Sequence, residues 1–475
     1  MADGPFIYCF AKDLRLDDHA GLAAAASRGT VLPMLAIDAA LRARLEVSPR
    51  RAAFFCAAVA ALDAELRERG TRLVVARAEA ADAIRALARA NHAAGVAWGA
   101  SYDRAGIQRD RQLQSELEEG GLAAVIVHDA PAIGPEETAE ARSGAGPAYR
   151  AFAPYFDAWW KLPIASHEQP LLLRFTSSDG AVEDLPQPAE FGASASAVPA
   201  GAPAARDLLE TFLREGALTY ALAATAPAGD RTSHLAAHLS FGTIAARTVA
   251  GRVRERLTDP FVLGEERHSL RLFLRALAHR DFFLQLSWFY PWTHDEPLQE
   301  KMHGFTWERS HPALDAWRAG KTGFPFVDAG IRQLHATGWM HPHVRAVAAS
   351  LLCFDLGVDW RIGRDEWDSR LIEDDVALGT GNWQWIAGIG ADMAQYPRIY
   401  NPERQRRRCD PDGAYVRRWV GELRDLPLET WYGREAEQSQ LRLGLFAADS
   451  YPKPVVDHAS AARAFLRRYR EFVSP

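Results

Sequence analysis

The chain has 475 residues, of which 48% are hydrophobic and 24% charged, as in an ordinary globular protein with a large core. Its net charge of −6 argues against a generally basic nucleic-acid binder, although a local basic patch can still contact phosphates. The four cysteines are scattered without a CxxC pair, so we expect no metal site. Because the chain shows no apolar run of about 20 residues and no secretory leader, we expect a cytoplasmic protein without membrane contact, and a monomer.

Apolar strands alternate with helical patterns over the first 130 residues. The expected strands are 5–10, 31–37, 72–76, 95–98 and 123–127. Residues 51–69 and 79–91 have helical periodicity. This alternation predicts an α/β domain with a doubly wound parallel sheet at 1–130. No GxGxxG follows the first strand, so a nicotinamide-binding function is not supported.

The rest of the chain divides into a connector and a helical domain. Residues 131–205 are rich in Pro, Ala, Ser and Gly, and they predict a long connector with one short helix at 147–160. Residues 206–475 carry helical patterns without strand alternation, which predicts an all-α domain. The expected helices are 207–214, 244–257, 265–287, 325–337 and 342–355.

The densest chemistry lies between Trp339 and Arg398. Trp383 and Trp385 sit in a glycine-rich stretch, and three carboxylates cluster just upstream at 371–375. Glycines let the backbone approach a flat ligand closely. Tryptophans beside buried acids therefore indicate a pocket for a large aromatic molecule.

Four motifs in this region, in the order GWMHPHVR, DWRIG, GNWQW and YPRIYNP, resemble the flavin-binding domain of the photolyase/cryptochrome family. The resemblance runs from DLRLDD near the start to RRWVGELRDLP near the end. It implies an α/β domain followed by an all-α domain that binds FAD, and a light-driven reaction. The resemblance leaves open a second, antenna chromophore of unknown identity, because Tyr102, Asp103 and Arg109 lie in a stretch similar to the family's antenna loop, whereas the N-terminal pattern is altered to CFAKDLR from Cys9 to Arg15.

The stretch from Arg231 to Ile244 contains an expected helix start, which Thr232 and Ser233 are suited to cap. Helix N-termini bind anions. The resemblance places the FAD diphosphate here, with His234 and Ala236 replacing the usual Arg and Ser. The phosphate-side residues it implies are Tyr220, Thr232, Ser233, His234 and Leu235.

The resemblance also implies residues beside the flavin ring. Arg345 and Glu373 match an Arg–acid pair, which equally reads as a structural salt bridge. Asp375 matches an acid at the polar flavin edge, and Arg280 matches a retained arginine. The position facing the flavin N5, usually Asn or Asp, is Gly379, so a side chain that tunes the flavin is missing.

Trp307, Trp360 and Trp383 match the tryptophans that carry electrons from the surface to the flavin in this family. Any one of them alone would more often be core filling. Trp385, Trp339 and Trp317 also match, and we interpret them as structural or pocket lining.

The substrate side departs from the family pattern. Ala276 and His279 replace the Glu and Trp that bind a pyrimidine dimer, while Pro342 and Ala346 replace other repair residues. Losing the charged partner costs about 1.5–3 kcal/mol, and losing the stack costs roughly 1–3 kcal/mol. His279 and His343 are candidates for a different polar pocket, although structural roles are the simpler reading. The expected DNA-contacting residues are Ala276, His279, Arg280, His343, Trp385, Arg398, Arg404 and Arg406.

Three functions remain open. A photolyase would use photoreduced FAD to repair a flipped DNA lesion, for which the arginine run after YNP is suited. A cryptochrome-like photoreceptor without repair activity would explain the missing pocket residues. A dark redox flavoprotein, or a DNA-binding module without catalysis, has no supporting motif. The sequence favours the photolyase.

Overall fold

A computed structural model describes residues 4–142, 146–164, 173–178, 183–392, 397–431 and 451–473. The chain forms two compact units, which are treated separately. Unit 1 comprises Met1–Tyr220, Ser233–His294 and Ile372–Leu378, and unit 2 comprises Ala221–Thr232, Asp295–Leu371 and Gly379–Pro475. The domain boundaries expected at 130 and 205 stay a prediction.

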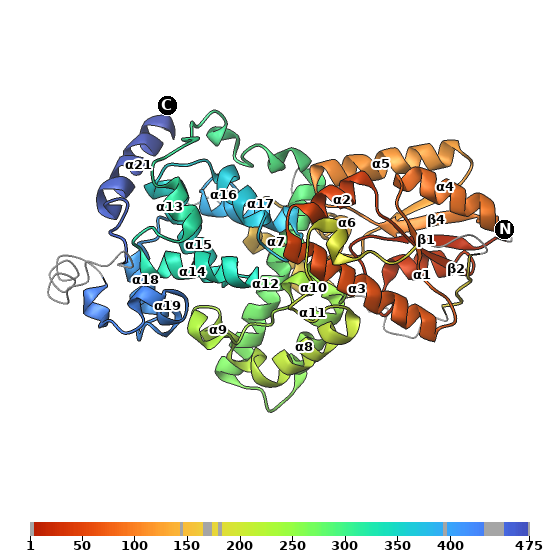
Figure 1. Cartoon of the computed structure of the whole chain (residues 1–475), viewed down its shortest axis with the longest axis horizontal. Helices are drawn as coiled ribbons and strands as arrows, with labels where there is room; N and C mark the ends of the chain where they lie inside the picture. Colours follow the sequence, from red (N-terminus) through yellow and green to blue (C-terminus); the bar gives the residue numbers. More distant parts are fainter. Residues whose placement is uncertain are drawn as a thin grey trace. The chain divides into compact units, whose positions relative to one another are not determined.

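Unit 1 contains a five-stranded sheet in the order β3-β2-β1-β4-β5, with all neighbours parallel (Figure 1). Its strands are β1 (Phe6–Phe10), β2 (Val31–Ala36), β3 (Val74–Ala76), β4 (Gly95–Gly99) and β5 (Ala123–Val127). The doubly wound parallel sheet expected from the sequence is confirmed.

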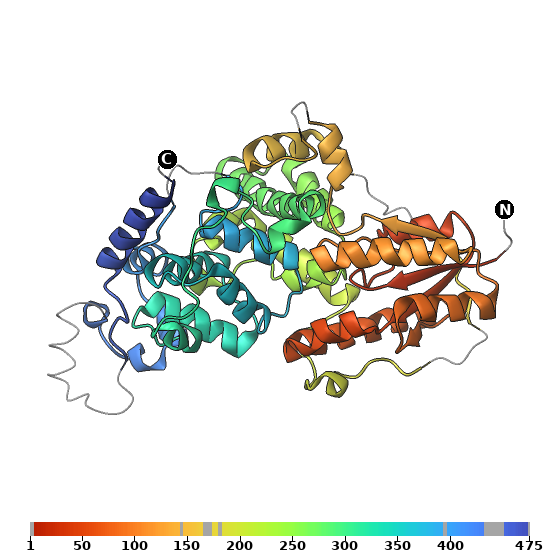
Figure 2. The same cartoon turned by 90° about the horizontal axis from the view of Figure 1, so that it is seen from above.

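Helices cover both faces of this sheet, as Figure 2 also shows. Phe6, Tyr8 and Phe10 of β1 pack in one core with α1 (Ala20–Ala26) and α3 (Pro49–Glu68). The alternate residues Ile7 and Cys9 pack in another core with α4 (Ala80–Asn91) and α5 (Arg104–Glu119). A strand covered on both faces is apolar throughout, which is why β1 shows no polar alternation.

Unit 1 also holds α2 (Ala39–Glu46), which lies between β2 and α3, and the helices that follow the sheet. The latter are α6 (Pro135–Glu140), α7 (Phe152–Lys161), α8 (Ala202–Glu215), α10 (Ala236–Ser240), α11 (Ala246–Thr258) and α12 (Gly264–Phe289). The short helix expected at 147–160 corresponds to α7, whereas α6, also within 131–205, was not expected. Helix α9 (Tyr220–Ala223) leads from unit 1 into unit 2.

Unit 2, drawn mainly in teal and blue in Figure 1, is helical in the part that the structure describes, apart from an isolated bridge between Glu308 and Val358. Its helices are α13 (Leu314–Ala319), α14 (Pro325–Thr337), α15 (Pro342–Ser350), a π-helix (Leu351–Asp355), α16 (Trp360–Asp368), α17 (Val376–Ile386, which begins in unit 1), α18 (Pro402–Cys409), α19 (Ala414–Trp419) and α21 (His458–Val473). The expected all-α domain is confirmed. Among the described helices, none has the length and apolarity needed to cross a membrane.

Helix α16 positions the tryptophans of unit 2. Asp359 begins the helix by accepting a hydrogen bond from the Arg361 backbone N–H. The buried residues Trp360, Gly363 and Trp367 are spaced i, i+3 and i+7, so they share one face. A Cβ on Gly363 would overlap the Trp383 ring. Glycine is therefore required at 363 for Trp383 to lie against this face.

A buried ion network joins distant segments of unit 1. Asp129 is paired with Arg15 at 2.6 Å and with Arg247 at 2.8 Å, and Arg247 is also paired with Asp18 at 2.7 Å. Burial alone would raise the pKa of Asp129, but Arg15, His19 and Arg247 hold it well below its usual range. The network ties the end of the sheet to α11.

Candidate functional site

The indole of Trp383 lies in a buried cluster of tryptophans in unit 2. Its ring centroid is 4.5 Å from that of Trp367 and 6.5 Å from that of Trp317, and the Trp317 and Trp367 rings stack at 5.9 Å. All three side chains are at most 5% exposed. Trp367 was not predicted from the sequence, although its spacing of seven residues from Trp360 is the signal that could have found it.

The other two expected electron carriers have different surroundings. Trp360 is fully buried, with the guanidinium groups of Arg361 and Arg364 at 4.8 and 5.2 Å from its ring. Trp307, the expected surface end, is 8% exposed and stacks at 5.8 Å on Phe465 of α21. Within the described residues, no two of Trp307, Trp360 and Trp383 are in direct ring contact. Their role as one chain stays a prediction.

The expected phosphate-side residues divide between the units. The predicted cap is wrong, because α10 begins at Ala236 with Leu235 as its N-cap residue, beyond the reach of Thr232 and Ser233 as caps. The Ser233 hydroxyl accepts instead from the Leu235 backbone N–H. Leu235 is fully buried, and His234 has a positive φ of 52°. The Tyr220 ring packs edge-on against Phe273 at 5.2 Å.

Two positions in unit 2 bear on whether these residues fit FAD. The Thr232 hydroxyl oxygen is buried and has no hydrogen-bond partner among the described residues, which suits it to a ligand acceptor. A Cβ added at Gly379 would meet no described heavy atom within 4 Å, so this position has open space beside it. Both features fit a bound cofactor.

The three carboxylates at 373–375 have separate surroundings in unit 1. Asp374 is paired with Lys12 at 2.7 Å and with Arg44. Burial would raise the pKa of Asp374, but Lys12, Arg51 and Arg44 lower it strongly. Asp374 is therefore the structural acid of the cluster, which the sequence did not distinguish.

Asp375 accepts from the Leu378 backbone N–H and lies 3.5 Å from Arg280 Nε. The guanidinium of Arg280 also donates to the Ala130 and Leu239 carbonyls, and the residue is only 7% exposed. This arginine is thus directed inward, so an outward contact with DNA phosphates, which the sequence suggested, is not supported by the geometry.

The two residues of the expected Arg–acid pair belong to different units. The backbone carbonyl of Glu373 in unit 1 accepts from Arg51, and Arg345 Nε in unit 2 donates to the Met340 carbonyl. Their contribution to a flavin site stays a prediction.

His279 lies at the position where the family pattern has a tryptophan that stacks on a pyrimidine dimer. In unit 1 its ring lies flat against Phe152 of α7, with centroids 3.3 Å apart and planes 11° apart. Burial, followed by the nearby Arg275, lowers the pKa of His279 to about 4. The ring is therefore neutral at pH 7 and is covered on one side by Phe152, whereas Ala276 one turn earlier is exposed.

Removing the covering ring should restore the ordinary titration of His279. We expect Phe152→Ala to raise the pKa of His279 toward its usual value of about 6.5, because its charged form would regain water. Titration of the histidine ring signals by NMR measures this. Phe156→Ala on the same helix is the matched control and should produce a smaller shift. An unchanged His279 pKa in Phe152→Ala would show that Phe152 does not cover the ring.

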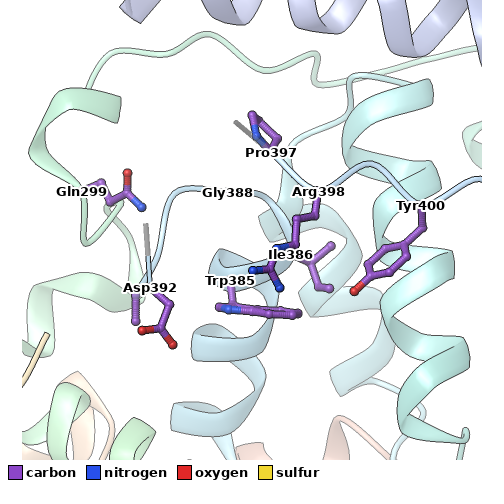
Figure 3. A pocket seen from close by; sticks show the side chains of 9 residues that line it. Gln299, Trp385, Ile386, Gly388, Asp392, Pro397, Arg398 and Tyr400 are labelled. Carbon is purple, nitrogen blue, oxygen red and sulfur yellow. The ribbon is translucent and has the colours of Figure 1, made fainter. Parts of the chain in front are cut away.

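A recess in unit 2 brings together Trp385 and Arg398, both expected to contact DNA (Figure 3). The Arg398 guanidinium lies over the Trp385 ring at 5.8 Å from its centroid. The recess encloses about 410 Å³, part of it open to solvent, and its wall also includes Gln299, Asp392 and Tyr400. Sequence reasoning missed these three residues, because Gln299 comes from a distant segment, whereas Asp392 and Tyr400 lie near Trp385 and Arg398 in stretches that were read for other residues.

The arginine run on α18 presents fewer outward charges than expected. Arg404, Arg407 and Arg408 are exposed. Arg406 is 5% exposed and donates to the Asp410 carbonyl, so its predicted DNA contact is not supported. His343, a residue of α15, places its Nε2 3.0 Å from Oε1 of Gln405, which belongs to α18.

The expected antenna loop has structural contacts in unit 1. The hydroxyl of Tyr102 lies 2.6 Å from His128 Nδ1, and Asp103 caps α5 by accepting from the Gly106 N–H. Arg109 is exposed on α5. These contacts do not identify a pigment.

Known families match both parts of the chain. The family model described as DNA photolyase matches residues 6–171, and the model described as the FAD binding domain of DNA photolyase matches residues 273–471. A deoxyribodipyrimidine photo-lyase from Halobacterium salinarum is 35% identical over 468 residues, which cover 94% of this chain and 95% of the relative.

Solved structures of photolyases and of a cryptochrome also resemble this chain. A bacterial class III photolyase from Agrobacterium tumefaciens superposes with a TM-score of 0.86 at 28% identity, covering 99% of this chain and 98% of its own. An archaeal photolyase from Sulfolobus tokodaii, with two FAD molecules and an implied novel light-harvesting cofactor, has a TM-score of 0.82 at 25% identity and coverages of 98% and 100%. A Synechocystis cryptochrome has a TM-score of 0.83 at 25% identity and coverages of 99% and 100%. With its parallel-sheet domain, its FAD-binding helical domain and its buried tryptophans, this chain belongs to the photolyase/cryptochrome family.

Proposed function

We propose that this protein is a DNA photolyase, which uses blue light and FAD to split a pyrimidine lesion in DNA. FAD binding is shared by photolyases and cryptochromes, so it does not separate the two. The observation that carries the proposal is the recess in unit 2, where an indole face and a guanidinium meet. Such a pair suits a nucleobase and its phosphate.

Bound FAD supplies light absorption and one-electron chemistry, and the chain supplies everything else. Trp383 would give one electron, and its burial excludes water from the donor. Thr232 would offer a hydroxyl to a phosphate oxygen. At Gly379, which matches the position that usually tunes the flavin, the chain has open space and no side chain.

On the DNA side, the exposed arginines Arg404, Arg407 and Arg408 would contact backbone phosphates, while Trp385 would stack on a flipped base. Ala276 cannot supply the hydrogen-bonding carboxylate of a standard dimer pocket, and His279 is engaged by Phe152. Recognition would therefore depend on the Trp385 side of the lesion more than in relatives with the usual residues.

Illumination of chemically reduced protein with two DNA substrates tests the proposal. One oligonucleotide contains a cyclobutane dimer and the other a (6-4) product. We expect light-dependent restoration of intact pyrimidines in the dimer substrate. Absence of restoration in both, with FAD present, would reject the photolyase assignment.

A cryptochrome-like photoreceptor is the second candidate, favoured by Ala276 and His279 at the repair positions. It would photoreduce FAD without repairing either lesion. The same illumination experiment separates the candidates, because a photoreceptor retains bleaching of FAD but restores no bases.

Loss of the stacking ring should weaken binding to damaged DNA. We expect Trp385→Ala to weaken binding by about 1–3 kcal/mol, because the flipped base would lose its aromatic platform. Fluorescence anisotropy with dimer-containing DNA measures the effect at fixed salt. Trp419→Ala removes a partly exposed indole from outside the recess and serves as the control. Equal affinities of Trp385→Ala and wild type would exclude Trp385 from the DNA site.

A further inference from the structure

We propose that Trp383 feeds a second, buried electron-transfer branch that runs through Trp367 to Trp317, in addition to the expected route through Trp360 and Trp307. The inference rests on the proposed light reaction, because it concerns where the positive charge goes after Trp383 has lost an electron.

Contact geometry supports this branch directly. Trp367 lies closest to Trp383, with centroids 4.5 Å apart, and stacks on Trp317 with planes only 17° apart. Trp317 itself reaches Trp383 at 6.5 Å, so the three rings form a closed set of contacts. Electron exchange between aromatic rings becomes faster as the rings approach one another, and within the described residues Trp383 has ring contacts with Trp367 and Trp317 but none with Trp360.

The positions of the tryptophans on helix α16 explain why two electron-transfer routes begin at Trp383. Trp360 and Trp367 lie one turn before and one turn after Gly363, against which the Trp383 ring packs. Trp383 therefore has one tryptophan of this helix on each side along the axis. The helix offers the oxidised ring two possible electron donors.

Charge favours the new branch. Two guanidinium groups, from Arg361 and Arg364, lie over Trp360 and disfavour a positive charge on that ring. Their carboxylate partners, Asp359 and Asp365, reduce this effect without removing the cations. Among the described residues, no cation lies over Trp317, Trp367 or Trp383.

Hydrogen bonding points the same way. Trp317 Nε1 donates to the Ala348 carbonyl at 3.0 Å, and this acceptor stabilises positive charge on the indole. The Nε1 atoms of Trp360 and Trp367 are both buried without a described acceptor, so neither of these rings has this stabilisation. A peptide carbonyl is too weak a base to take the indole proton, so a cation on Trp317 keeps its proton and can return the charge.

The electron balance is simple. Bound FAD would supply the oxidant in light, and Trp383 would give up one electron to it. One electron then moves from Trp367 to Trp383, and a second transfer moves one electron from Trp317 to Trp367. No bond forms or breaks, and the positive charge ends on Trp317, which is fully buried from external reductants. The branch stores charge reversibly, whereas Trp307, at 8% exposure, offers the exit toward solvent.

Flash photolysis of the FAD-loaded protein tests the branch by following the transient absorption of the tryptophan cation radical. Trp360→Phe cuts the expected route, and we expect it to retain a tryptophan radical signal because Trp367 and Trp317 still accept the charge. Trp360→Phe with Trp367→Phe should weaken and shorten this signal, because Trp383 then keeps only its longer contact with Trp317. Trp360→Phe with Trp431→Phe is the matched control, because Trp431 is buried in unit 2 outside the cluster, and should keep it.

Equal radical lifetimes and amplitudes in Trp360→Phe and in the double variant with Trp367→Phe would overturn the branch, provided that both bind FAD equally and melt alike. A wild-type protein that binds FAD but shows no tryptophan radical would overturn the proposed light reaction, and the branch with it. The two failures are therefore distinguishable.

Discussion

Trp383→Phe is expected to abolish the bleaching of oxidised FAD under blue light while leaving the bound FAD unchanged. Phenylalanine keeps most of the apolar packing, but it is far harder to oxidise than an indole. Both the expected route and the proposed branch begin at Trp383, so no bypass through Trp360, Trp367 or Trp317 should remain. The measurement is the rate of loss of oxidised-flavin absorbance in the presence of an external reductant.

The control must remove a buried indole without touching the cluster. Trp431→Phe fulfils this, because Trp431 is 4% exposed and packs against Gly413. It should photoreduce at the wild-type rate. Bleaching of Trp383→Phe at the same rate as Trp431→Phe would show that electrons reach FAD by another path.

Asp129→Ala is expected to have the largest effect on stability. It removes the carboxylate that Arg15 and Arg247 share, and leaves both guanidinium groups buried at 3–5% exposure. Breaking a buried ion pair in this way costs about 3–5 kcal/mol of unfolding free energy. Denaturant unfolding of unit 1, followed by circular dichroism, measures the loss.

Asp17→Ala is the matched control, because Asp17 pairs with Arg206 while its side chain is 60% exposed. Such a pair contributes about 0–1 kcal/mol. Similar stability losses in the two variants would contradict the structural role given to Asp129.

The stabilisation that Asp129 provides should depend on pH. The pKa of Asp129 is lower in the folded than in the unfolded state. Its stabilisation is therefore fully present above the unfolded value of about 3.9 and is lost as pH falls toward the folded value. The stability difference between wild type and Asp129→Ala should shrink below about pH 4.

The fold was predictable where burial imposes a regular pattern. The five strands are apolar because helices cover both sheet faces, and α14 and α15 begin at Pro325 and Pro342. Family motifs identified FAD, because they occur in order along the whole chain. Positions within such motifs could be aligned without any knowledge of their contacts.

The features of the candidate site that the sequence did not predict depend on contacts made after folding. Phe152 covers His279 from a helix far away in the sequence, so the residue type at 279 gave no sign of it. Arg406 turns inward because Asp410 offers a carbonyl one turn later, whereas its neighbours Arg407 and Arg408 face solvent. Thr232 and Ser233 resemble helix caps, yet the helix begins at Ala236. Trp367 was missed because it lies outside the DWRIG motif that contains Trp360, although both tryptophans lie on one face of α16.

We propose that this chain holds FAD and, in light, reduces it through its buried tryptophans. The most direct measurement is the absorption spectrum of the purified full chain before and after blue light with a reductant. We predict oxidised-flavin bands that decline on illumination, and release of FAD on denaturation. A colourless protein, or flavin bands that light leaves unchanged, would contradict this account.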